Sequence, residues 1–127
     1  FCIFVLTKYL IMKANELRIG NYVKTDRTNL IKVKEIHEYI IKWYSEHLKH
    51  EENLNSIEPI PLTEQWLLDL GLTENREGQF CYNGLMFSVG IDHLKCFVNG
   101  YFLLDIDNNV HTIQNLIFAL TGSELTK

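Results

Sequence analysis

Two histidines and two aspartates in the C-terminal third of the sequence are the residues best suited to acid–base chemistry. They are His93, Asp105, Asp107 and His111. Asp105 and Asp107 are two residues apart, so on a continuous strand both carboxylates lie on one face, as a pair that shares a proton or a cation requires. Neither histidine has a nucleophile nearby in the sequence that it could activate. We therefore expect these four residues to be solvated rather than catalytic.

Metal and cofactor chemistry finds little support in the sequence. His47 and His50 have loosely ligand-like spacing, but a structural zinc site needs four closely paired ligands. The cysteines Cys2, Cys81 and Cys96 form no C-x-x-C pair. The sequence contains no glycine-rich nucleotide motif, P-loop, G-x-S-x-G or H-E-x-x-H string. We expect no metal, no cofactor and no enzymatic activity, and an enzyme with a cleft at the four residues above is the third-ranked alternative.

Basic residues gather in the first half of the chain. Residues 12–50 carry eight basic and five acidic side chains, a net charge of +3, whereas residues 51–127 carry three and eleven, a net charge of −8. A basic surface with interleaved aromatic rings can bind phosphates and stack on bases. The acidic surplus would repel a phosphate backbone, so nucleic-acid binding is the second-ranked hypothesis. Its candidate contacts are Arg18, Lys24, Arg27, Lys32 and Lys34.

Two adjacent aromatic residues, Trp43 and Tyr44, are candidates for a surface that docks a protein partner. The leading hypothesis is a non-enzymatic binding or accessory protein that acts through such a partner. It requires an exposed apolar or aromatic patch, and it allows a homodimer built on sheet edges. Whether the chain is a monomer or a homodimer is left open.

The elements that must position these residues indicate an α+β fold with two lobes. Residues 12–56 are expected to form a small β-lobe, with an SH3-like arrangement as one option. Alternation of apolar residues predicts a strand over Leu17–Lys24. The stretch Leu30–Leu48 fits either an amphipathic helix or two twisted strands, and we favour strands because a lone strand would have no partner. We expect a polar loop over His47–Ser56.

Residues 57–127 are expected to form a helix, a four-stranded antiparallel meander and a C-terminal helix, in one compact unit with the first lobe. Thr63 is a good N-cap for a helix over Glu64–Leu70, and Thr112 is a plausible N-cap for a second helix that ends at Gly122. Two Asn-Gly pairs, at residues 83–84 and 99–100, predict tight hairpins, because type I′ turns need positive φ at both central residues. The predicted strands are Gln79–Tyr82, Leu85–Gly90, Leu94–Val98 and Tyr101–Ile106.

The segment Phe1–Ile11 is strongly apolar but too short to span a bilayer, which needs about 20 apolar residues. It also lacks the basic start and cleavage site of a secretion signal. We interpret residues 1–11 as a non-native or upstream segment joined to a protein that starts at Met12. Three scattered cysteines fit a reducing compartment, so we expect a cytoplasmic location without membrane contact.

Three strings in order carry a resemblance to a known group of proteins. They are LRIGNYV (Leu17–Val23), EPIPLTEQWLL (Glu58–Leu68) and QNLIFALTGSEL (Gln114–Leu125). Together they resemble a group of small proteins common in Bacteroidetes genomes and often encoded near phage or other mobile-element genes. That group has no established activity, so the resemblance implies a bacterial or phage setting and transfers no site residue.

Overall fold

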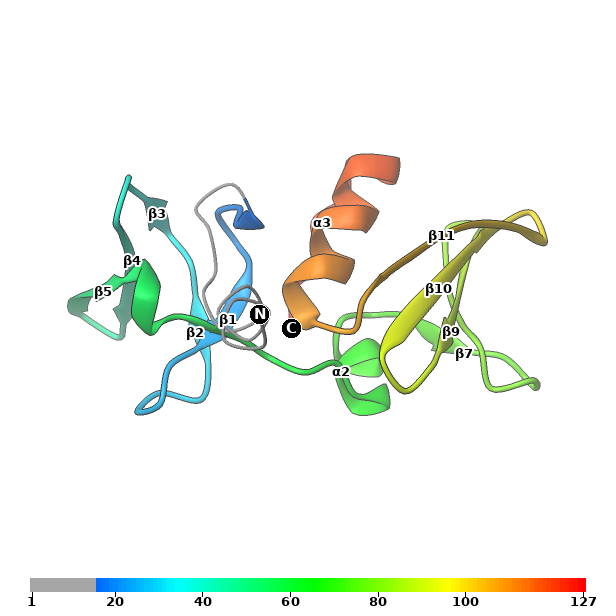
Figure 1. Cartoon of the computed structure of the whole chain (residues 1–127), viewed down its shortest axis with the longest axis horizontal. Helices are drawn as coiled ribbons and strands as arrows, with labels where there is room; N and C mark the ends of the chain where they lie inside the picture. Colours follow the sequence, from blue (N-terminus) through cyan, green and yellow to red (C-terminus); the bar gives the residue numbers. More distant parts are fainter. Residues whose placement is uncertain (1–15) are drawn as a thin grey trace, which may run out of the picture. The chain divides into compact units, whose positions relative to one another are not determined.

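Short antiparallel strands dominate the structure, a computed structural model that describes residues 16–127. Within that range the α-helices α2 and α3 accompany the strands (Figure 1). The predicted class is confirmed in this form: the protein is a small mixed α+β protein with mostly antiparallel strands. Residues 1–11, which we interpreted as non-native, lie outside the described residues. The chain divides into two compact units, Phe1–Ile60 and Pro61–Lys127.

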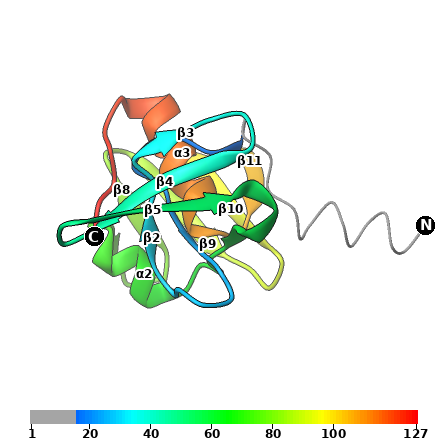
Figure 2. The ribbon, with the colours of Figure 1, turned by 90° about the vertical axis from the view of Figure 1, so that its left-hand side faces the viewer.

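The first unit holds two small antiparallel sheets. One has the order β2-β1-β6 and is made of β1 (Tyr22–Lys24), β2 (Ile31–Lys32) and β6 (Glu58–Pro59). The other has the order β3-β4-β5 and is made of β3 (Glu35–Ile36), β4 (Ile40–Ser45) and β5 (Leu48–Asn53). A 3-10 turn, η2 (Leu54–Ser56), follows β5. Figure 2 shows β4 and β5 side by side as a long hairpin.

Three local expectations for this unit are settled by its strands. The helical alternative for Leu30–Leu48 is wrong, because that stretch forms β2, β3 and β4, as its β-branched and aromatic residues favour. The loop predicted over His47–Ser56 is also wrong, because most of it is β5, an outer strand whose largely exposed residues show no apolar alternation. The strand predicted over Leu17–Lys24 shrinks to β1, since Gly20 turns the chain at a φ of 99°.

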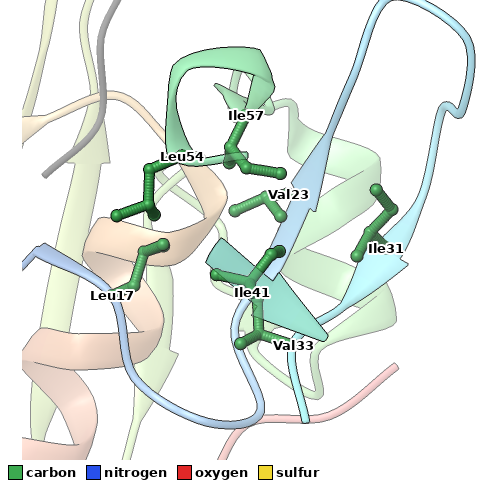
Figure 3. Close-up of a cluster of buried hydrophobic side chains, with 7 residues drawn as sticks. All are labelled: Leu17, Val23, Ile31, Val33, Ile41, Leu54 and Ile57. Carbon is green, nitrogen blue, oxygen red and sulfur yellow. The ribbon is translucent and has the colours of Figure 1, made fainter. Parts of the chain in front are cut away.

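A cluster of buried apolar side chains forms the core of the first unit (Figure 3). It consists of Leu17, Val23, Ile31, Val33, Ile41, Leu54 and Ile57, with Ile36 and Trp43 packed against it. Ile57 thus belongs to this core, and β6 pairs with β1. The division between the units therefore falls after Ile60 and not after the predicted residue 56.

The second unit contains two helices and a five-stranded antiparallel sheet of order β11-β10-β9-β8-β7. The helices are α2 (Glu64–Asp69) and α3 (Val110–Thr121). The strands are β7 (Thr73–Glu74), β8 (Phe80–Tyr82), β9 (Leu85–Val89), β10 (His93–Val98) and β11 (Tyr101–Asp107). The sheet thus has five strands where we expected four, because β7 adds to β8 at one edge.

Local capping and turn chemistry explains the limits of these elements. Asn99 and Gly100 adopt φ values of 52° and 83°, the left-handed pair that a type I′ turn requires, and β11 follows at once. The Oγ1 atom of Thr63 accepts a hydrogen bond from the backbone N of Trp66 at 3.2 Å, so α2 begins where expected. Helix α3 begins earlier than expected, at Val110.

The early start of α3 is a correction to the predicted N-cap. Asn109 is the N-cap, and Thr112 occupies the third helical position, where its Oγ1 accepts a hydrogen bond from the backbone N of Asn109 at 3.3 Å. This arrangement is a capping box, in which the third residue returns a hydrogen bond to the cap. Both residues have capping side chains, so the sequence alone did not distinguish them.

Candidate functional site

The outermost strand of the five-stranded sheet exposes a run of large apolar side chains. Tyr101 is 79% exposed, Phe102 57% and Leu103 43%. They lie at the start of β11, which ends the sheet, and within residues 16–127 no strand pairs with its outer edge. A long apolar edge strand offers unpaired N–H and C=O groups together with an apolar surface, which other chains can use for pairing. We refer to Tyr101, Phe102 and Leu103 as the β11 apolar patch.

A bulge shapes this patch. The register of β10 and β11 shifts between Cys96 and Phe97, so Leu103 has no partner residue on β10. Bulges bend a strand and redirect its side chains. Phe102 packs edge-to-face against Phe97, with ring centroids 5.9 Å apart and planes at 73°. This ring contact fixes the position of Phe102 within the exposed apolar surface.

The second half of β11 is acidic. Asp105 and Asp107 are exposed, and the strand register places them opposite Lys95 and His93. No ion pair involving either carboxylate occurs within the described residues. Strand β11 therefore presents an apolar half followed by an acidic half along one free edge.

This patch was not predicted from the sequence, although a signal was present. Tyr101–Leu104 is a run of four large apolar residues in a strand that should alternate if only one side were buried. Such a run is typical of a strand whose two faces are both buried, or of a strand whose outer face contacts another molecule. Because Tyr101, Phe102 and Leu103 are exposed, burial of both faces does not explain the run.

The four residues of the acid–base alternative do not meet on one surface. His93, Asp105 and Asp107 are exposed on the sheet, whereas His111, in the first turn of α3, is only 4% exposed. Burial lowers the pKa of His111 to about 4, against the opposing influence of the Asp107 charge, and its Nδ1 atom is buried without a partner in the described part of the chain. His111 is thus a neutral core residue at ordinary pH.

Trp43 and Tyr44, the predicted docking pair, point to opposite faces of the sheet. Both lie on β4, where side chains alternate between the two faces. Trp43 is on the side of Ile41 and packs against the core of the first unit. Tyr44 is on the outer side and half exposed. The two side chains therefore do not share one face of the sheet.

Trp43 has a structural role in the hairpin of β4 and β5. The Trp43 ring stacks on His50 of β5, with centroids 4.1 Å apart, and the Nε2 atom of His50 lies 2.7 Å from Ser45 Oγ. The Nε1 atom of Trp43 is buried without a partner among the described residues. These contacts tie β4 to β5 on the inner side of the hairpin.

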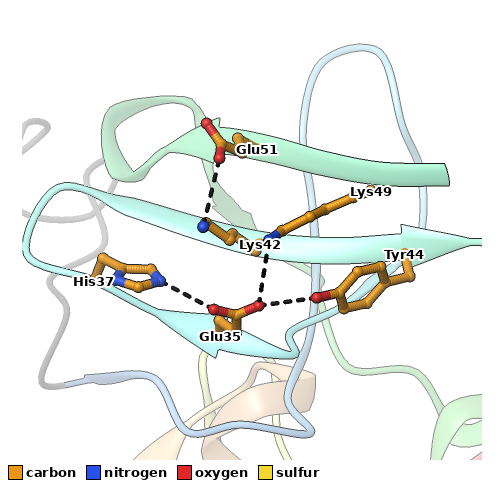
Figure 4. A network of polar contacts seen from close by, with 6 residues as sticks. All are labelled: Glu35, His37, Lys42, Tyr44, Lys49 and Glu51. Carbon is orange, nitrogen blue, oxygen red and sulfur yellow. Dashed lines mark hydrogen bonds and ion pairs between the residues drawn. The ribbon is translucent and has the colours of Figure 1, made fainter.

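Tyr44 belongs to a polar network on the outer face (Figure 4). Its hydroxyl donates to Glu35 Oε2 at 2.9 Å, while His37 Nε2 lies 3.3 Å from Oε1 of the same carboxylate. The Tyr44 hydroxyl and then His37 lower the pKa of Glu35, and the hydrogen bond to Glu35 raises the pKa of Tyr44. Lys49 lies 3.9 Å from Glu35. A tyrosine with a raised pKa is not an activated nucleophile, so we interpret the network as structural.

The structure places only some of the predicted nucleic-acid contacts together. Lys32 on β2 lies opposite Tyr22 on β1, with its Nζ atom 5.9 Å from the ring centroid, and Lys24 shares that face because it is two residues from Tyr22. Glu58 of β6 lies directly opposite Lys24. Lys34 follows β2, Arg27 is exposed in the turn between β1 and β2, and Arg18 is half-buried ahead of β1.

The difference in net charge between the two parts of the chain becomes smaller when the charges are counted for the two observed units. Phe1–Ile60 includes Glu51, Glu52 and Glu58, so it carries nine basic and eight acidic residues, a net charge of only +1. Pro61–Lys127 carries three basic and eight acidic residues, a net charge of −5. The first unit is therefore nearly neutral, and the second unit is acidic.

The described residues hold no cluster of metal ligands and no membrane-spanning helix. Within residues 16–127, no group of three or more His, Cys, Asp or Glu residues is arranged to hold a metal ion. The helices of the same range are all too short or too polar to cross a membrane. Comparison of the chain with models of protein families, with curated proteins and with solved structures gives no match.

Proposed function

We propose that the protein is a non-enzymatic binding protein that acts through a protein partner docked at the β11 apolar patch. The exposure of Tyr101, Phe102 and Leu103 on a free sheet edge carries this proposal. Removing such residues from water contributes roughly 25 cal/mol per Å² of apolar surface. Contiguous exposed apolar surface of this kind marks interaction sites in folded proteins.

The cellular setting is part of the same proposal. The three strings that resemble small proteins of mobile elements, together with the scattered cysteines, support an accessory role in a phage or other mobile element in the bacterial cytoplasm. We further propose an SH3-like arrangement for the first unit, supported by its two small sheets around one apolar cluster.

A peptide-display selection tests the docking surface while the natural partner is still unidentified. The purified protein is used to select from a random peptide library, and each binder is then measured against a variant with Tyr101→Ser and Phe102→Ser. We expect the selected peptides to lose affinity for the variant. Its circular dichroism should match that of the original protein and its unfolding midpoint should fall only slightly, because both side chains are largely exposed and only the Phe97–Phe102 ring contact is lost. Peptides that keep full affinity for the variant would refute the proposed surface.

Nucleic-acid binding is a second candidate because two of its predicted contacts, Lys24 and Lys32, lie on one face of the β2-β1-β6 sheet, where both can bind phosphates. The Tyr22 ring beside Lys32 is buried, so the support comes from charge and not from base stacking. A titration with labelled DNA and RNA at two salt concentrations tests it. Salt-sensitive binding that an Arg27→Glu, Lys32→Glu variant loses, and that a Lys42→Glu, Lys49→Glu variant keeps, would establish it. No binding at low salt would exclude it.

A further inference from the structure

The free edge of β11 has the features of a site for strand addition. Its seven residues pair with β10 on one side only, and every strand pair in the described residues is antiparallel. An extended segment that adds to such an edge gains main-chain hydrogen bonds, while its side chains determine specificity. The bulge at Leu103 interrupts the ladder, and the Asp107 carbonyl oxygen already accepts hydrogen bonds from the backbone N of Asn109 and from Thr112 Oγ1. Regular pairing is therefore expected along Leu104–Ile106.

Charge indicates which kind of segment fits. Asp105 and Asp107 are exposed at alternate positions in the C-terminal half of β11, without an ion-pair partner among the described residues. The unit that contains them has a net charge of −5. An acidic partner strand would place like charges opposite each other, which destabilises a ladder, whereas basic side chains would be attracted.

On the basis of the free edge of β11 and of the apolar and acidic halves of this strand, we propose that its partner is a cationic, extended peptide segment. The segment adds antiparallel to the sheet. Its basic residues, at alternate positions, lie opposite Asp105 and Asp107. Its apolar or aromatic residues follow and cover the β11 apolar patch. This inference rests on the proposed function, because it names the partner chemistry of the same surface.

The test uses the full chain and labelled peptides of defined sequence. The first peptide has two lysines at alternate positions ahead of two aromatic residues, the order that antiparallel pairing requires. In the second, glutamates replace the lysines. The third keeps the lysines but carries N-methyl groups on the backbone nitrogens that would enter the ladder. Binding is measured by fluorescence anisotropy at low and at physiological salt.

We expect the lysine peptide to bind and the glutamate peptide to bind at least about tenfold more weakly. A charge-reversed protein, Asp105→Lys with Asp107→Lys, should invert that preference. A matched variant, Glu74→Lys with Glu77→Lys, changes the net charge by the same amount at the opposite edge of the sheet, near β7. It should bind like the original protein. N-methylation should abolish binding, because it removes the main-chain donors.

Several results would overturn the inference. They are equal binding of the lysine and glutamate peptides, unchanged binding after N-methylation, or an equal loss in the matched charge variant. A dimer in sedimentation velocity that dissociates in Phe102→Lys would assign the edge to a second copy instead. If display peptides need Tyr101 and Phe102 but the lysine peptide does not bind, the proposed function stands and this inference fails. If no peptide of either kind depends on those residues, both fail.

Discussion

Strands β5 and β11 each lie at the edge of a sheet, but the side chains that they expose to solvent differ in chemical character. After the exposed Leu48, β5 consists of polar and charged residues that include Lys49, Glu51 and Glu52. The first half of β11 is Tyr-Phe-Leu-Leu. Charged side chains on an edge strand discourage pairing with other chains, whereas apolar ones promote it. The β5 edge is therefore protected against pairing with other chains, whereas the β11 edge lacks this protection.

The turns that lead into β5 and β11 also differ, because the residues of the β11 turn are the less strained. The β10–β11 turn is Asn99-Gly100, both at positive φ, which these residue types adopt readily. The β4–β5 turn places Glu46 at a φ of 50°, a strained value for that residue type. The hairpin with the exposed apolar edge therefore has the better turn, so its exposure does not follow from a poorly formed strand.

The largest predicted effect contrasts the two sides of the second unit's sheet. Phe87 on β9 is fully buried, so Phe87→Ala should lower the free energy of unfolding by about 3–5 kcal/mol. Phe102→Ala, on the exposed side, removes only the ring contact with Phe97 and should lower it by about 1 kcal/mol. Urea denaturation followed by circular dichroism measures both. Similar costs for the two variants would contradict the assigned sides.

Acid should weaken the second unit through His111. Its pKa is about 4 in the folded state and about 6.5 when unfolded, so the unfolded state binds more protons between these pH values. The stabilisation is complete above pH 6.5 and is lost as the pH falls towards 4, by an amount on the order of 3 kcal/mol.

His111→Gln should flatten this pH dependence, whereas His93→Gln, at an exposed position, should leave it intact. Urea midpoints between pH 4 and 7 provide the measurement. A pH dependence that survives in His111→Gln would assign it to other groups.

Exchanging turn residues should reduce the difference between the hairpins. Glu46→Gly should stabilise the protein by about 0.5–1 kcal/mol, because glycine adopts positive φ without steric cost. Asn99→Ala should destabilise it by about 1 kcal/mol, since alanine is strained at a φ of 52°. Thermal unfolding detects both shifts, and a destabilised Glu46→Gly variant would show that the Glu46 side chain has a role of its own.

Exchanging edge chemistry should change association more than stability. Lys49→Val with Glu51→Val makes β5 apolar and should produce concentration-dependent association in sedimentation velocity. Phe102→Lys should reduce any association of the original protein. Unfolding free energies should move by no more than about 1 kcal/mol in each variant. If apolar β5 stays monomeric, edge charge is not what protects it.

The smallest effect concerns the protected hairpin alone. Glu35→Gln removes the carboxylate that accepts from Tyr44, so the raised pKa of Tyr44 should fall towards the ordinary tyrosine value. Ultraviolet absorbance during an alkaline titration reports on this change, with Tyr39→Phe used to subtract a neighbouring tyrosine. No change in the titration would show that the hydrogen bond does not persist in solution.

Some parts of the site were accessible from the sequence and others were not. The position of Asp105 and Asp107 on one strand face followed from their spacing alone. The same alternation rule separates Trp43 from Tyr44, but it could be applied only once β4 was known to be a strand. Strand β5 was not predicted because an outer strand with both sides largely in water has no reason to alternate.

Features that depend on neighbouring residues could be read from the sequence: the Asn-Gly hairpins, the Thr63 cap and the α+β class. These follow from backbone preferences and from hydrogen bonds that span three or four residues. The pairing of β6 with β1 and the burial of His111 became known only from the folded chain. Both depend on contacts between segments far apart in the sequence, and no local pattern encodes them.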